Sequence, residues 1–179
     1  MQIQQKSPGT YVIKNTGASV VVNPVKTIQE DVVLFTNPDS ETEGEHVMKS
    51  AGEFEAKDIF VYGKKAIGEE TVLYAVHLEN ITTGIITGIH AKKAVPDDFF
   101  DDAQIIILQV GDGTDAIAPK EAYELLQKLS PNVAIIYSSD SKILEDFKAL
   151  TTINPLEKNW KATEEELGRI ETTEFYYFA

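Results

Sequence analysis

Oxygen-bearing side chains alternate along one short segment of the chain, Asn37-Pro38-Asp39-Ser40-Glu41-Thr42. The Asn37 amide and the Asp39 and Glu41 carboxylates follow directly after an apolar run at residues 32–36. Hard cations such as Mg²⁺ and Ca²⁺ take oxygen ligands of this kind. One interpretation is therefore a weak Mg²⁺ or Ca²⁺ site at Asp39 and Glu41. The interpretation we favour is a solvated acidic turn, with no bound cofactor.

Short runs of β-branched and aromatic residues in the first half of the chain predict strands. The runs at residues 11–13 and 18–22 flank Asn15-Thr16-Gly17, a turn sequence that predicts a hairpin. The run at residues 32–36 is continuous, as expected of a strand that is covered on both faces. Further strands are predicted at residues 53–55, 59–62, 72–78 and 84–87.

Strands and helices alternate in the second half, which predicts layers with helices packed outside sheets. Strands are expected at residues 105–109 and 133–137, and a helix is expected to begin at Pro119, where the missing N–H costs nothing. Its apolar residues recur at helical spacing: Ala122, Leu125, Leu126 and Leu129.

Two further helices are predicted from their capping residues. Ser138-Ser139-Asp140 offers N-cap oxygens for the first, and Thr163 followed by Glu166 fits a capping box for the second. The first of these helices should bury one stripe of side chains: Ile143, Leu144, Phe147 and Leu150. We expect the aromatic run at residues 174–178 to complete a sheet within the monomer, and contact between subunits of a homo-oligomer is the alternative.

Composition excludes several classes of function. The chain has 179 residues, which predicts a single domain spanning residues 1–179. Its net charge is −13, so nucleic acids and anionic membrane surfaces should repel it. The sequence contains no cysteine, which excludes disulfides and thiolate metal sites. The N-terminus has no apolar signal core, and no apolar run approaches the ~18 residues of a membrane span, so we expect a cytoplasmic protein.

Several segments resemble metallo-β-lactamase-fold hydrolases of the ascorbate-6-phosphate-lactonase-like branch. Residues 20–24 resemble that family's strand ending in Asp-Pro, residues 32–42 its metal-binding turn, and residues 51–55 its Pro-Gly-Glu-Tyr-Glu segment. The order and spacing agree over roughly residues 10–140. The resemblance implies an α/β (α+β) architecture, a four-layer αββα sandwich, with the site at one edge between the sheets.

The family's metal ligands do not recur at the matching positions. The family places His-x-His-x-Asp-His at its metal turn, with a bridging Asp and a final His further along the chain. The remnant positions in this chain are Asn37, Asp39, Glu41, Thr42, Ile89 and Ser138. Zinc and its relatives prefer imidazole, thiolate or carboxylate ligands, and without the ion no comparable hydroxide nucleophile forms at neutral pH. We therefore predict no catalytic, metal-binding or cofactor-binding residue.

The leading hypothesis is a non-catalytic pseudoenzyme with a binding or assembly role toward an unidentified protein or small molecule. One alternative is a metal-dependent hydrolase with a rebuilt site that uses Asn37, Asp39, Glu41 and a nearby histidine, with His46 and His90 as the candidates. The other alternative is a small-ligand binder that uses the vacated cleft. The sequence does not indicate whether that cleft is open or filled by side chains.

Overall fold

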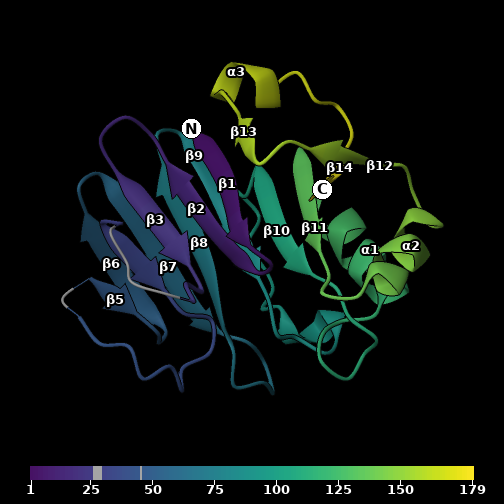
Figure 1. The fold of residues 1–179 in the computed structure, drawn as a ribbon, viewed down its shortest axis with the longest axis horizontal. Coiled ribbons are helices and arrows are strands. Elements are labelled where there is room, and N and C mark those ends of the chain that lie inside the picture. Colours follow the sequence, from purple (N-terminus) through teal and green to yellow (C-terminus); the bar gives the residue numbers. More distant parts are fainter. Residues whose placement is uncertain (26–29, 45) are drawn as a thin grey trace.

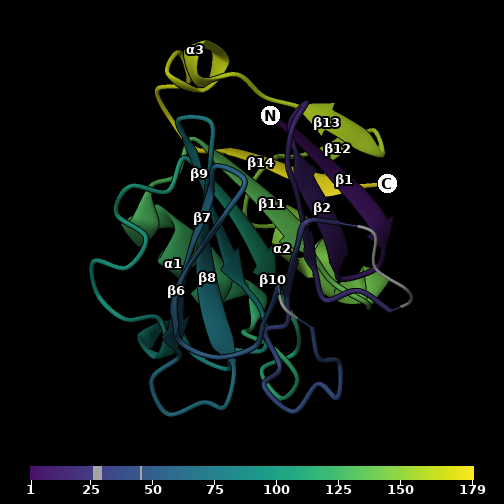
Figure 2. The same ribbon diagram turned by 90° about the vertical axis from the view of Figure 1, so that its left-hand side faces the viewer.

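Two β-sheets lie face to face in the computed structural model, which describes residues 1–25, 30–44 and 46–179 (Figure 1). Figure 2 views the molecule from the β6 side, with the larger sheet to the left of the smaller one. The N-terminus lies near β13, and the C-terminus lies at the end of β14 (Figures 1 and 2). This arrangement confirms the predicted α/β sandwich.

The smaller sheet has six strands in the order β13-β1-β2-β3-β4-β5. Its strands are β1 (Gln2–Ser7), β2 (Thr10–Lys14), β3 (Ser19–Val22), β4 (Val32–Leu34), β5 (Val47–Met48) and β13 (Asn159–Lys161). The predicted hairpin is confirmed: β2 and β3 pair in antiparallel fashion, and the Asn15 side chain accepts hydrogen bonds from the backbone of Gly17 and Ala18. Strand β3 is parallel to β4, and β4 is parallel to β5.

The larger sheet has eight strands in the order β12-β14-β11-β10-β9-β8-β7-β6. Its strands are β6 (Gly52–Ala56), β7 (Ile59–Lys65), β8 (Val72–Leu78), β9 (Ile81–Ile86), β10 (Ile105–Gln109), β11 (Val133–Tyr137), β12 (Ile153–Leu156) and β14 (Glu174–Phe178). Strands β9, β10, β11 and β14 run parallel. The C-terminal aromatic run therefore completes a sheet inside the monomer, as predicted.

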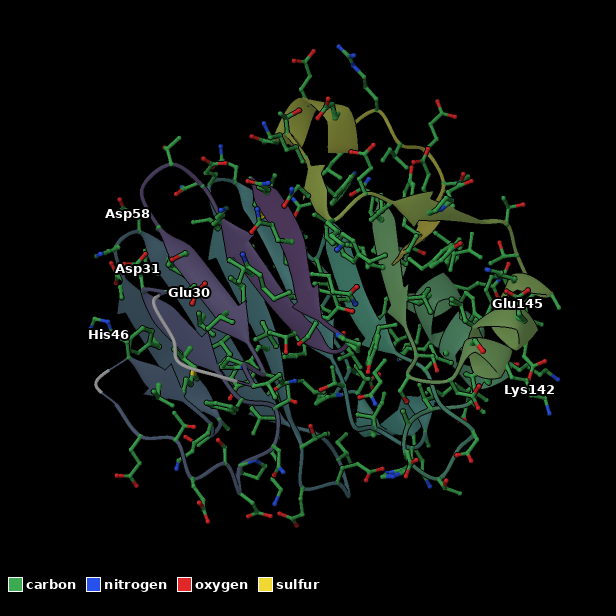
Figure 3. All side chains as sticks on the ribbon, in the orientation of Figure 1. Glu30, Asp31, His46, Asp58, Lys142 and Glu145 are labelled. Atoms are coloured by element: carbon green, nitrogen blue, oxygen red, sulfur yellow. The ribbon has the colours of Figure 1, made fainter. Side chains whose placement is uncertain are left out.

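Three α-helices and one 3₁₀ turn complete the described elements: α1 (Pro119–Leu129), α2 (Ser141–Lys148), α3 (Glu164–Leu167) and η1 (Lys92–Ala94). The predicted caps are confirmed, because the Asp140 side chain accepts a hydrogen bond from the Lys142 N–H and Thr163 forms a capping box with Glu166. Lys142 and Glu145 of α2 extend into solvent (Figure 3). None of the helices in the described ranges is long and apolar enough to cross a membrane.

Alternation along β10 divides the core into two layers. Ile105 and Ile107 face the smaller sheet, while Ile106 and Leu108 face the helices, where Leu126 packs with them. The outer face of the smaller sheet carries a third cluster, Val12, Val21, Val33, Phe35 and Val47, with no helical residue among its described members. Burial on both faces explains the continuous apolar runs of the parallel strands.

Several predicted boundaries were wrong: β9 is Ile81–Ile86 where residues 84–87 were predicted, and β7 extends to Lys65 where residues 59–62 were predicted. Strand β4 ends at Leu34, not at Thr36, because the chain crosses at Thr36 to the larger sheet, where the Thr36 carbonyl accepts the Val72 N–H at 2.8 Å. Helix α2 ends at Lys148, so Leu150 lies beyond the helix and is exposed instead of buried.

Candidate functional site

A cleft of about 780 Å³ opens at one edge of the sandwich. The residues that follow β3, β4 and β9 line it, together with the loop between β7 and β8. Strand β3 is parallel to β4 and β9 is parallel to β10, so the carboxyl ends of these strands meet at this edge. Such edges are the usual ligand-binding positions of parallel sheets. The cleft therefore lies where the resemblance placed the family's site.

A hydrogen-bonded set of polar side chains forms the floor of the cleft. The Thr87 hydroxyl donates to the Thr36 hydroxyl at 2.7 Å, which joins the two sheets. The Asn23 side-chain nitrogen donates to the same Thr36 oxygen at 3.0 Å, and the Asn23 side-chain oxygen accepts the Thr36 N–H at 2.9 Å. Thr36 and Thr87 are only 5% and 6% exposed. These three residues, Asn23, Thr36 and Thr87, form what we call the floor network.

A third threonine, Thr71, contacts the backbone of the floor network. The Thr71 hydroxyl lies 3.0 Å from the Thr36 carbonyl and 3.0 Å from the Thr87 carbonyl. Within the described residues, no buried side-chain nitrogen or oxygen lacks a hydrogen-bond partner. The polar groups of the floor therefore satisfy one another, as buried polar groups must to avoid a desolvation cost.

An acid–imidazole pair lies in the wall of the cleft. His90 Nδ1 is 2.8 Å from a Glu69 carboxylate oxygen, and the His90 backbone N–H donates to the same carboxylate. The hydrogen bond to Glu69 raises the pKa of His90, with smaller contributions from the Thr114 backbone and Asp115. The same bond lowers the pKa of Glu69. At pH values between these two pKa values the pair is an imidazolium bound to a carboxylate.

The cleft is poor in positive charge. Glu70 joins Glu69 in its lining, and no lysine or arginine lines it in the part of the chain that the structure describes. The Gln109 side chain accepts a hydrogen bond from Gly88 N–H at 3.2 Å, which holds this amide at the opening. Amides, hydroxyls and carboxylates therefore supply the polar surface that faces a ligand.

Only one of the six remnant positions lines the cleft. Asn37 does so, and its side-chain oxygen accepts the Asp39 N–H at 2.9 Å, which is an Asx turn. Asp39 and Glu41 are exposed and lie outside the lining. The Thr42 N–H donates to the Ser40 hydroxyl at 3.4 Å. The oxygen-rich segment thus forms a turn at the cleft's margin.

Neither of the two later remnant positions lines the cleft. Ile89 is completely buried in the core between the larger sheet and the helices. The Ser138 hydroxyl accepts the Asp140 N–H at 3.2 Å, close to the start of α2. Neither isoleucine nor serine is among the Cys, His, Asp and Glu residues that supply zinc ligands in proteins.

The residues present do not fit the metal centre that the fold implies. Among the described residues, no group of three or more His, Asp or Glu side chains is placed to hold a metal ion. His90 reaches the cleft, whereas His46 lies beside Phe54 and His77 bonds Thr82. The donor set at the strand ends is hydroxyl and amide, which zinc-type ions bind weakly.

The floor network was not singled out from the sequence. Thr36 and Thr87 each follow a buried strand directly, and this position was the available signal, since the carboxyl ends of parallel strands converge. Asn23 stands in the segment matched to the family's Asp-Pro strand end, but no role was predicted for it. Glu69 lies in a loop whose sequence gave no indication of a partnership with His90.

Comparison of the sequence with protein-family models and with curated proteins found no match. Solved structures are similar in fold. A protein assigned to the Zn-dependent hydrolases of the metallo-β-lactamase superfamily from Thermotoga maritima aligns with a TM-score of 0.76 at 16% identity, covering 99% of both chains. A protein assigned to the metal-dependent hydrolases from Parabacteroides distasonis aligns at 0.61 and 16% identity, covering 82% of this chain and 86% of that one. The metallo-β-lactamase-fold protein YhfI from Bacillus subtilis aligns at 0.59 and 11% identity, covering 84% and 92%. With its two facing sheets and an edge cleft at the strand ends, this chain has the metallo-β-lactamase fold.

Proposed function

We propose that this chain is a non-catalytic binding protein on the metallo-β-lactamase fold, and that its cleft holds a small polar ligand. The observation that carries the proposal is the floor network of Asn23, Thr36 and Thr87. The side chains of these residues hydrogen-bond to one another at the strand ends, where a hydrolase of this fold would need metal ligands. Without a metal-bound hydroxide, no other described group supplies a comparable nucleophile.

The lining favours an uncharged, hydroxyl-rich ligand such as a sugar or polyol. Among the described residues no lysine or arginine lines the cleft, and the nearby cations, His90 and Lys65, are already paired with Glu69 and Glu70. A phosphate or carboxylate ligand would therefore find no unpaired cation in the lining. Carboxylates and amides accept hydrogen bonds from ligand hydroxyls, while Phe35 and Pro24 offer apolar surface. A cavity of about 780 Å³ lies within the range of small-molecule sites.

Two measurements test the proposal. Protein purified without chelator and soaked in Zn²⁺, Mn²⁺ or Mg²⁺ should lose the metal on dialysis, as measured by elemental analysis. Retention of metal in stoichiometric amount would contradict the non-catalytic assignment. In a thermal-shift screen, neutral sugars and polyols should raise Tm while sugar phosphates do not. At a ligand concentration about 100 times Kd the stabilisation is about 2.7 kcal/mol, or roughly 5–10 °C for a chain of this length.

A matched pair of variants locates the ligand. Glu69→Gln should reduce the ligand-induced rise in Tm, because it removes a carboxylate from the cleft wall. Glu171→Gln, an exposed change outside the cleft, should leave the rise unchanged. If Glu69→Gln had no effect on a ligand that stabilises the protein, that ligand would bind elsewhere.

A hydrolase is the second candidate, and the Glu69–His90 pair favours it. An imidazole oriented by a carboxylate is a common general base. The test is ester and lactone hydrolysis in the presence of a strong chelator. Activity that persists with chelator and falls in His90→Asn would replace the binding assignment with a metal-independent hydrolase.

A further inference from the structure

The β6–β8 part of the larger sheet exposes aromatic residues on its outer face. Strand β7 alternates: Ile59 and Val61 are completely buried toward the smaller sheet, while Phe60 and Tyr62 are 41% and 38% exposed. Figure 2 shows β6, β7 and β8 side by side on the side of the molecule that faces the viewer. The cleft at the strand ends uses neither Phe60 nor Tyr62.

Two more rings extend this aromatic surface. Phe60 is paired with His77 across β7 and β8, and the Tyr62 ring stands at 90° to the His77 ring, 5.4 Å from it. Phe99, from the segment before β10, carries the Lys64 amine 5.7 Å from its ring centre. We call Phe60, Tyr62, His77 and Phe99 the aromatic patch. A hollow of about 400 Å³ adjoins it between β7 and residues 97–103, and Tyr62, His77 and Phe99 of the patch line it together with Lys64.

Carboxylates flank the aromatic patch on both sides. On β6, Glu53 is paired with Tyr62 and Glu55 with Phe60. On the other side lies an acidic run containing Asp97, Asp98, Asp101 and Asp102. All of these carboxylate residues are exposed.

Few positive charges offset these carboxylates. Lys128 binds Asp97 at 2.6 Å, and Lys64 lies over Phe99. Burial lowers the pKa of His77, although Asp102 acts in the opposite direction, so the ring is neutral at neutral pH. The potential of this face is therefore negative.

We propose that the aromatic patch docks a basic segment of a partner protein, with an arginine or lysine side chain of that segment in the hollow between Tyr62 and Asp102. A cation over an aromatic face is attracted by the ring quadrupole, and flanking carboxylates add charge-assisted hydrogen bonds. Aromatic residues surrounded by a charged rim are typical of interfaces. Opposite charge also steers association, whereas a second copy of this chain would bring the same carboxylates and a net charge of −13.

The test uses defined peptides and matched variants. A short fluorescent peptide that alternates arginine with glycine, and the same peptide with glutamate in place of arginine, are titrated by fluorescence anisotropy at physiological ionic strength. The arginine peptide should bind and the glutamate peptide should not. Tyr62→Ser and Asp102→Asn should each weaken binding by roughly fivefold or more. Asp146→Asn, which removes one exposed carboxylate on α2, should change Kd by less than about twofold.

Three results would overturn the proposal. The first is an equal loss of affinity in Asp102→Asn and Asp146→Asn, which would indicate unspecific attraction to an acidic protein. The second is a set of peptide-induced NMR shifts that lie outside β7, β8 and residues 97–103. The third is a dimer, seen by analytical ultracentrifugation, that Tyr62→Ser abolishes while the arginine peptide fails to bind. Circular dichroism of each variant checks folding. If Tyr62→Ser is unstable, the comparison of Asp102→Asn with Asp146→Asn still tests the proposal, because both are exposed polar changes.

Discussion

The hydrogen bond between Thr87 and Thr36 joins the two sheets and should be measurable as a coupling free energy. Its oxygens are 2.7 Å apart, and both side chains are almost completely buried. Valine has the shape of threonine but no hydroxyl, so Thr36→Val, Thr87→Val and the double variant form a thermodynamic cycle.

The two single changes should differ in cost. Thr87→Val removes a donor, but the Thr36 hydroxyl keeps the Asn23 amide, so the free energy of unfolding should fall by about 1 kcal/mol. Thr36→Val removes the acceptor used by both Thr87 and Asn23, leaving buried polar groups without a partner, and should cost about 2–4 kcal/mol. The double variant no longer contains the stranded Thr87 hydroxyl. Its cost should therefore be less than the sum of the single costs by about 1–2 kcal/mol.

Equilibrium urea unfolding, followed by circular dichroism and by the fluorescence of Trp160, gives these free energies. Thr83 provides the control, because it is buried in β9 and makes no hydrogen bond to Thr87. Four residues along a strand separate the two side chains by about 13 Å. Thr83→Val and Thr87→Val should therefore be additive within about 0.5 kcal/mol. If the free-energy costs of Thr36→Val and Thr87→Val also added within about 0.5 kcal/mol, the two hydroxyls would not be coupled and the floor network would not exist as described.

Two further predictions concern the cleft wall and the contact between the sheets. NMR titration should place the pKa of His90 above its usual 6.5, and Glu69→Gln should return it toward that value; an unchanged pKa would show that the pair does not form. Because the folded-state pKa of His90 is raised, its stabilisation is complete below about pH 6.5 and is lost as the pH rises through the folded-state pKa. Because the pKa of Glu69 is lowered, its share is present above about pH 4.5 and is lost as the pH falls through the folded-state pKa. The difference in Tm between the native protein and Glu69→Gln should thus be greatest between these pH values. Gly63→Ala should lower the free energy of unfolding by about 1–3 kcal/mol, because its Cβ would stand 2.9 Å from the Ser50 carbonyl oxygen. Gly17→Ala, whose nearest such contact is 3.9 Å, should melt close to the native temperature, and equal melting of the two variants would refute the steric argument.

Elements with local signals were predicted well. The Asn15 turn, the Asp140 N-cap and the Thr163 capping box each involve residues two to three positions apart. Such interactions depend on the sequence of one turn alone, so they can be recognised without knowledge of the rest of the chain. The apolar runs of β8, β10 and β11 were equally clear, because burial on both faces leaves few polar positions in them, His77 in β8 and Gln109 in β10.

Strands without a clear apolar pattern were not predicted. Strand β1 is rich in glutamine and lysine, and only Ile3 within it is completely buried. It becomes a strand by pairing with β2 and with β13, which lies at the other end of the chain. Strand β12 contains Pro155 and pairs with β14. Pairing with distant partners carries no local signal, so it could not be predicted from these segments.

The sequence by itself determined which residue types are available at the strand ends. The matching of this chain to the metallo-β-lactamase pattern predicted Asn37, Ile89 and Ser138 at the positions of metal ligands, and the absence of cysteine excluded thiolate sites. These statements need only residue types and spacing, because isoleucine has no donor atom and a chain without cysteine has no thiolate in any fold.

Tertiary structure decided what occupies the cleft floor. The Thr36–Thr87 bond spans 51 residues of sequence, and the Glu69–His90 bond spans 21. Which hydroxyls and carboxylates meet depends on the order and register of strands in two sheets, and hence on the packing of the whole core. Likewise, only that packing left Phe60 and Tyr62 uncovered while the other face of β7 became part of the core.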